Sequence, residues 1–107
     1  MPTLVIHAPH SEVKQNQNQS FNQTFTTGRG DGYAISSGLF TQISPGDAVV
    51  MICKVHKKQA EGRIKELCPT VKAGNGIQRY DVLMVDLKMV PYTHESIRLN
   101  RNGVTVI

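Results

Sequence analysis

The sequence predicts a mainly β protein: a β-barrel with one or two short helices, folded as a single domain over residues 1–107. Short apolar segments recur along the chain, and groups of glycine, proline, asparagine and aspartate separate them where turns are expected. Apolar residues at helical spacing occur in one short stretch. Many short strands with little helix are typical of a barrel, because closing the sheet removes its exposed edges.

The first strand is predicted at residues 3–7, and Pro9 ends it because proline cannot donate to a ladder. The following segment, 11–32, is rich in Asn, Gln, Thr and Gly and shows no strand or helix periodicity before Phe21 and Phe25. This composition predicts a long mobile loop. Long loops often act as lids or binding loops, and the two phenylalanines would attach this one to the body of the protein.

The middle of the chain is predicted to contain the central strand. A second short strand at 33–36 leads to one or two helical turns at 38–43, where three apolar residues share one helical face. Pro45 and Gly46 then form a turn, since proline presets its own φ and glycine accepts a positive one. The run that follows, 48–55, is β-branched and almost continuously apolar, which indicates a central strand.

The second half of the chain alternates between strands and turns. A basic hairpin tip is expected at 57–59 and a glycine-containing loop at 72–76. Only part of one face of the strand predicted at 60–67 is apolar, so this strand is expected beside solvent. The strands predicted in this half are 60–67, 79–90, 96–99 and 103–107.

Composition favours a soluble protein with a negatively charged partner. Lys and Arg total 12 against 8 Asp and Glu, which gives a net charge of +4. This excess favours a polyanion, although a basic surface that serves only solubility has the same composition. No apolar run approaches the roughly 18 residues of a membrane span, and the N-terminus lacks signal-peptide features. We therefore expect a cytoplasmic protein without membrane contact, in which Cys53 and Cys68 are reduced thiols.

The first candidate site is the ligand-binding set Tyr33, Ser36, Ser37 and Gly38. Glycine lets backbone N–H groups approach a ligand closely, the two serines could hydrogen-bond a base edge or a phosphate, and Tyr33 could stack on a base. The same residues also fit a structural interpretation. Ser36 would then be the N-cap of the following helix, and Tyr33 would belong to the core.

The second candidate site is the basic set Lys54, Lys57, Lys58 and Arg63, close to the expected hairpin tip. Cations grouped in this way contact nucleic-acid phosphates and make binding depend on salt. Lysine is also common at hairpin tips for solubility, so the pattern by itself leaves both interpretations open.

Histidines raise the question of a metal or catalytic site. His7 and His10 lie three residues apart, and Cys53 and His56 have a similar spacing. A structural zinc site needs four ligands, so neither a metal nor another cofactor is predicted. General acid–base chemistry by one of the three histidines stays open as an alternative.

Five short motifs occur in an order known from one superfamily. They are residues 4–7, GYAIS at 32–36, 39–43, GDAVV at 46–50 and GRI at 62–64. This order resembles the PUA-like superfamily, and within it the EVE and YTH-type domains. The resemblance implies a PUA-like barrel with a pocket for a nucleic acid or a nucleotide. Relatives of the ASCH type in the same superfamily include enzymes that act on RNA or on modified nucleosides.

Together these features predict a module that binds a nucleic acid or nucleotide and reads a modified base in a pocket beside 33–38. The loop at 11–32 would close over the pocket, and the basic set would contact phosphates. One alternative is a small hydrolase or ribonuclease that uses His7, His10 or Lys54. The other is an accessory domain whose basic rim docks another protein.

Overall fold

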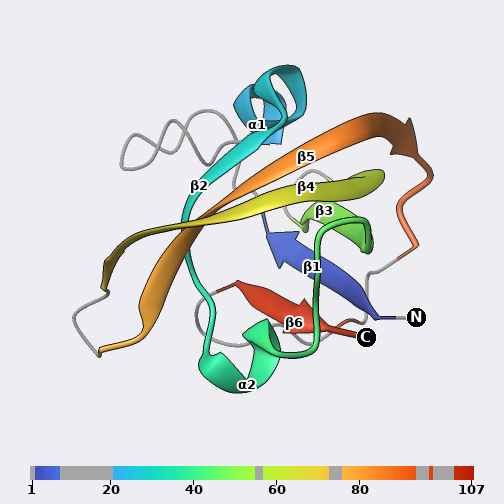
Figure 1. Ribbon diagram of the computed structural model, residues 1–107. Helices are drawn as coiled ribbons and strands as arrows, with labels where there is room; N and C mark the ends of the chain where they lie inside the picture. The colour runs from blue at the N-terminus through green and yellow to red at the C-terminus, as the bar shows by residue number, and fades with distance from the viewer. Residues whose placement is uncertain (1, 8–20, 55–56, 73–75, 94–96, 98–102) are drawn as a thin grey trace.

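The protein is a mainly β structure with two short helices, as the sequence predicts (Figure 1). The computed structural model describes residues 2–7, 21–54, 57–72, 76–93, 97 and 103–107. Its elements are β1 (Thr3–His7), α1 (Phe21–Thr27), β2 (Arg29–Ala34), α2 (Ser37–Phe40), β3 (Ala48–Cys53), β4 (Lys58–Lys72), β5 (Gln78–Val90) and β6 (Val104–Val106). No helix in these ranges has the length and apolar character needed to cross a membrane.

The strands form one mixed sheet in the order β2-β5-β4-β3-β1-β6. Strands β1 and β3 are parallel, and the other neighbours are antiparallel. Within the described ranges the two edge strands, β2 and β6, do not pair with each other, so the predicted closure into a barrel is not observed. Instead, the long β4–β5 ribbon crosses over β1 and β3 and bends the open sheet around its core (Figure 1).

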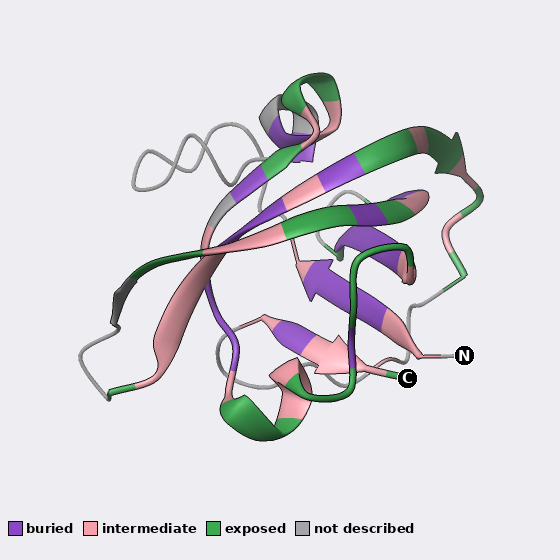
Figure 2. Ribbon diagram, viewed as in Figure 1, coloured by how far each residue is buried: buried purple, intermediate pink, exposed green. Residues whose placement is uncertain are grey.

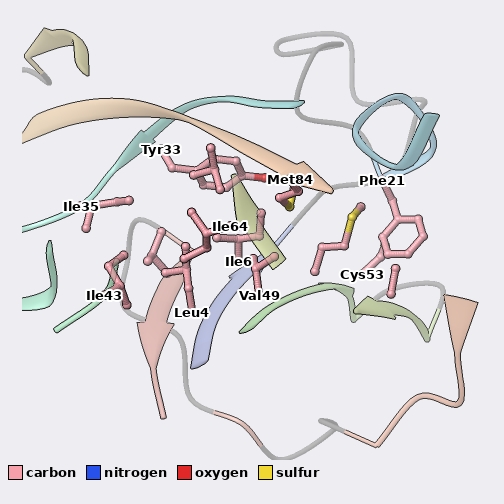
Figure 3. Packing of buried hydrophobic residues seen from close by; sticks show 14 residues of the cluster. Leu4, Ile6, Phe21, Tyr33, Ile35, Ile43, Val49, Cys53, Ile64 and Met84 are labelled. Atoms are coloured by element: carbon pink, nitrogen blue, oxygen red, sulfur yellow. The ribbon is translucent and has the colours of Figure 1, made fainter. Parts of the chain in front are cut away.

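The main core lies inside this bend. Leu4 of β1 and Val49 of β3 contribute from one half of the sheet, and Ile64 of β4 and Met84 of β5 contribute from the other (Figure 3). Because side chains alternate along a strand, Val50 points to the opposite, outer face of the sheet. Strands β1 and β3 are therefore buried on both faces (Figure 2), which explains their nearly continuous apolar sequence.

One half of the outer face of the sheet is covered by the segment that contains Tyr92 and Ile97. Tyr92 and Ile97 pack against a small cluster formed by Val5, Val50 and Ile52. Gln59, which is 1% exposed, holds the covering segment through its side-chain oxygen, which accepts a hydrogen bond of 2.9 Å from the Thr93 amide. The other half of the outer face has no such cover from the described residues.

The expected long loop at 11–32 is partly wrong. Residues 21–34 form α1 and β2, and only 11–20 lie outside the described residues. Phe21 and Phe25 are four residues apart, so one helical face carries both onto the core. Gly28 ends the helix with a φ of +70°, and its amide donates to the Thr24 carbonyl at 2.8 Å.

The remaining boundaries are close to the prediction. The turn at Pro45–Gly46 lies where the sequence places it, and β3 begins at Ala48 as predicted but ends at Cys53, two residues before the predicted end at 55. Strand β4 extends five residues beyond the predicted 60–67, to Lys72. Most of the predicted strand 96–99 lies outside the described residues. Ile97, which is described, is not in a strand.

Bulges bend the β4–β5 ribbon. Its register shifts at three places, and at one of them Asp86 and Leu87 together face Gly62. A Cβ atom on Gly62 would lie 2.6 Å from the carbonyl oxygen of Val85, so only glycine fits against the bulged strand. Bulges of this kind increase the local twist and bend of a strand.

We expect Gly62→Ala to destabilise the protein by about 1–3 kcal/mol, because the added methyl group meets backbone that cannot rotate away. Urea unfolding followed by circular dichroism measures the change. Gly38→Ala is the matched control, since no atom lies within 4 Å of a Cβ there and its φ is not positive. Equal stability of the two variants would contradict the packing described for Gly62.

Candidate functional site

Two of the four residues predicted to bind a ligand at 33–38, Tyr33 and Ser36, have structural roles. The Tyr33 ring is 3% exposed, and its hydroxyl donates to the His7 carbonyl at 3.1 Å. Ser36 is the N-cap of α2, where its hydroxyl oxygen accepts a hydrogen bond from the Leu39 amide at 3.4 Å. A ring buried in the core cannot stack on a base without being unpacked. Ser37 and Gly38 are exposed on α2, and ligand binding by this pair stays a prediction.

A concave site lies elsewhere, on the uncovered half of the outer face. It is an open hollow of about 590 Å³, within the size range of small-molecule sites. Its floor comes from the starts of β1 and β3 and from Ile107, and its wall comes from the β4–β5 ribbon. The lining residues are Thr3, Ala48, Val49, Val50, Glu61, Gly62, Arg63, Asp86, Lys88 and Ile107.

Four charged residues lie on the wall of the hollow: Glu61, Arg63, Asp86 and Lys88. Glu61 lies opposite Lys88 across the β4–β5 ladder, and Arg63 follows two residues later on the same face as Glu61. The Arg63 guanidinium donates to the carbonyl of Gly46 at 3.1 Å. Among the described residues, none of these four side chains forms an ion pair within 4.0 Å. No ion pair with a described residue therefore neutralises their charges.

Asp86 occupies the bulge with a φ of +57°, a left-handed conformation that favours glycine. For a residue with a side chain this conformation costs about 1 kcal/mol, and aspartate is among the residues that accept it most readily. Because of this extra residue, the side chains after Asp86 alternate between the two faces of the sheet in the opposite phase. Leu87 therefore packs on the core, while Lys88 turns to the outer face.

The predicted basic set is divided by the fold. Lys54, Lys57 and Lys58 gather at the turn between β3 and β4, which we call the basic turn. Arg63 lies opposite Ala48, at the far end of the same hairpin. Five residues separate Lys58 from Arg63, or about 17 Å at roughly 3.3 Å per residue. The structure therefore separates Arg63, which lines the hollow, from the three lysines of the basic turn, and phosphate binding by this set stays a prediction.

The basic turn also affects a histidine. His7 is half-buried at the end of β1, where desolvation and, second, the charge of Lys54 hold its pKa below the ordinary value of 6.5. Lys54 itself donates to the Ile97 carbonyl at 2.6 Å. His10 and His56 lie outside the described residues, so a histidine pair remains untested. Cys53 and Cys68 are free thiols.

Comparison with protein-family models, with curated proteins and with solved structures found no significant match. The resemblance to the PUA-like superfamily therefore stays a prediction.

Sequence reasoning missed Glu61, Asp86 and Lys88 as site residues. The available signal was a conflict in the predicted strand 79–90. Strict alternation places Asp86 and Lys88 on the same face as Val82, which is fully buried. A bulge resolves such a conflict, because one extra residue moves the following charge to solvent.

We expect Lys54→Gln to raise the pKa of His7 toward 6.5, because it removes a positive charge that opposes protonation. Titration of the imidazole signals by NMR measures the shift, with Lys65→Gln as the control. An unchanged His7 titration would show that Lys54 does not act on this imidazole.

The same lowered pKa gives a pH dependence of stability. As the pH falls, His7 of the unfolded chain binds a proton near pH 6.5, whereas His7 of the folded protein binds it only at a lower pH. The stabilisation from neutral His7 is therefore complete above this pH and is lost as the pH falls through the lower folded-state pKa. Urea unfolding between pH 7.5 and 5 should show a steeper loss for the wild type than for His7→Gln, at about constant ionic strength.

Proposed function

We propose that the protein binds a phosphate-bearing ligand of nucleotide size in the hollow. The observation that supports this function is the convergence of Arg63 and Lys88 on one concave site of about 590 Å³. Neither cation is paired with a carboxylate among the described residues. An anionic ligand would therefore not have to displace an existing ion pair.

The chemistry of the lining suits a phosphorylated, partly apolar molecule. A guanidinium group can bind a phosphate through two parallel hydrogen bonds, and the Lys88 ammonium adds a second positive charge. Ala48 and Val50 on the floor offer an apolar surface to a sugar or a base. Glu61 can accept hydrogen bonds from hydroxyl or amino groups of the ligand.

Two further features support a nucleotide as the ligand. The chain carries a net charge of +4, which favours anions in general. The sequence also resembles the PUA-like superfamily, for which nucleic acids and nucleotides are the implied ligands. An oligonucleotide is a second candidate, favoured by the three lysines that gather at the basic turn.

A hydrolase remains the alternative from another class. Its candidate proton acceptor is His7 at the end of β1, whose lowered pKa keeps the imidazole neutral near pH 7 but also makes it a weaker base than an ordinary histidine. Such an enzyme would cleave RNA or a nucleoside, and His7→Gln would abolish the turnover. Intact substrate after prolonged incubation with the wild type would exclude it.

We expect calorimetric titration with adenosine, guanosine, cytidine and uridine 5′-monophosphates to detect binding of at least one. Arg63→Ala and Lys88→Ala should each weaken it about tenfold, because each removes a hydrogen bond to a charged group. Lys65→Ala is the matched control, since Lys65 is an exposed lysine on the same ribbon that does not line the hollow. Absence of binding, or an equal loss in the control, would refute the proposal.

For an oligonucleotide, we expect filter binding of short single-stranded RNA to weaken as salt increases. Lys58→Gln and Lys57→Asn should each reduce the slope of log affinity against log salt by about 0.7, the loss of one phosphate contact. Asparagine is chosen because Lys57 has a φ of +51°, which asparagine tolerates. A slope that these variants leave unchanged would show that the basic turn does not contact the RNA.

A further inference from the structure

Three residues that line the hollow form one row across the outer face of the sheet. Thr3 of β1 is the register partner of Ala48 of β3, and Ala48 is in turn the partner of Arg63 of β4. Register partners point to the same face of a sheet, and adjacent strands lie about 4.8 Å apart. The Cα atoms of Thr3 and Arg63 are therefore about 10 Å apart, with the small side chain of Ala48 between them.

The Arg63 side chain is directed toward β3 and away from β5. Its guanidinium donates to the carbonyl of Gly46 at 3.1 Å, and Gly46 lies in the turn that leads into β3. This bond uses one of the five guanidinium N–H groups, so others remain for a ligand. The carboxylate of this turn, Asp47, is held within the turn itself, where it accepts a hydrogen bond from the Ser44 amide at 2.9 Å.

The space over Ala48 is separated from the carboxylates of the wall. Asp86 lies on β5, two strands away from Ala48 and on the opposite side of β4, which corresponds to about 10 Å. Glu61 stands in the next row, opposite Val50. Lys88 is the partner of Glu61, and its long flexible side chain can extend from that row toward an anion over Ala48.

Thr3 offers a hydrogen-bond donor on the other side of this space. Its hydroxyl has no hydrogen-bond partner among the described residues. A hydroxyl can donate to a phosphate oxygen, while the Arg63 guanidinium can bind the same phosphate through parallel N–H groups. The methyl group of Ala48 leaves the floor between these two donors open, whereas a longer side chain would occupy it.

We propose that the 5′-phosphate of the nucleotide lies over Ala48, between the Arg63 guanidinium and the Thr3 hydroxyl. The nucleoside then extends along the strands toward Val50 and Glu61. This inference rests on the proposed function, because it assumes that a nucleotide occupies the hollow. It adds an orientation for the ligand and assigns its phosphate to Thr3 and Ala48 as well as Arg63.

The substitution Thr3→Val removes the hydroxyl and keeps the shape of the side chain. For a 5′-monophosphate that the wild type binds, calorimetric titration should show about tenfold weaker binding, the effect of one hydrogen bond to a charged group. Thr3→Ser keeps a hydroxyl and should bind as the wild type does. Thr105→Val is the matched control, since Thr105 is a partly exposed partner of Val5 on β6 that does not line the hollow.

A second substitution tests the position of the phosphate. Ala48→Leu fills the floor and should weaken binding of the monophosphate by about tenfold or more, whereas Ala48→Ser, which adds little volume, should not weaken it. The nucleoside without phosphate, titrated by NMR, should bind the wild type and Thr3→Val equally. This comparison separates recognition from folding, because an unfolded variant would lose the nucleoside as well.

The outcomes distinguish this inference from the proposed function. Unchanged binding of the monophosphate by Thr3→Val or by Ala48→Leu, or an equal loss in Thr105→Val, overturns the orientation and leaves the hollow as a nucleotide site. An equal loss of nucleoside and nucleotide in Thr3→Val overturns it too, because the hydroxyl then does not act on the phosphate. Absence of wild-type binding to all four monophosphates overturns both.

Discussion

The close approach of Gly62 to the carbonyl of Val85 is the contact on which the rest of the structure depends. Two strands of 15 and 13 residues with a regular ladder would form a ribbon that twists but does not bend sharply at one place. The bulge at Asp86 requires backbone atoms to occupy the space where a side chain would project from Gly62. With glycine at this position the ribbon bends, and the open sheet encloses its own core.

The same bulge connects the core with the proposed site. Before it, alternate residues of β5, such as Val82 and Met84, point into the core. After it, Leu87 points inward and Lys88 points to the outer face. One inserted residue therefore completes the packing on one side of the sheet and places a cation in the hollow on the other. Stability and the proposed ligand binding would be coupled here through backbone geometry, since any change that removes the bulge alters both faces.

Local sequence patterns were sufficient for most strands. The continuous apolar run of β3 has one physical interpretation, a strand buried on both faces, and the turn at Pro45–Gly46 follows from the φ preferences of its residues. The helix at 21–27 was missed because its apolar face consists of two phenylalanines among polar residues. That face is stabilised by the core it contacts, and no local propensity reveals such a contact.

The sequence by itself determined the mainly β class, the central strand and the cationic character of the protein, because alternation and turn chemistry are local properties and net charge follows from composition. Only the tertiary structure decided that Tyr33 is buried, that Arg63 is separated from the basic turn, and that the strands described leave the sheet open. These features depend on the register between strands that are distant in the chain. Register follows from the fit of whole faces and from bulges, and the bulge at Asp86 left only an indirect signal in the sequence, two charged residues at positions that strict alternation would bury.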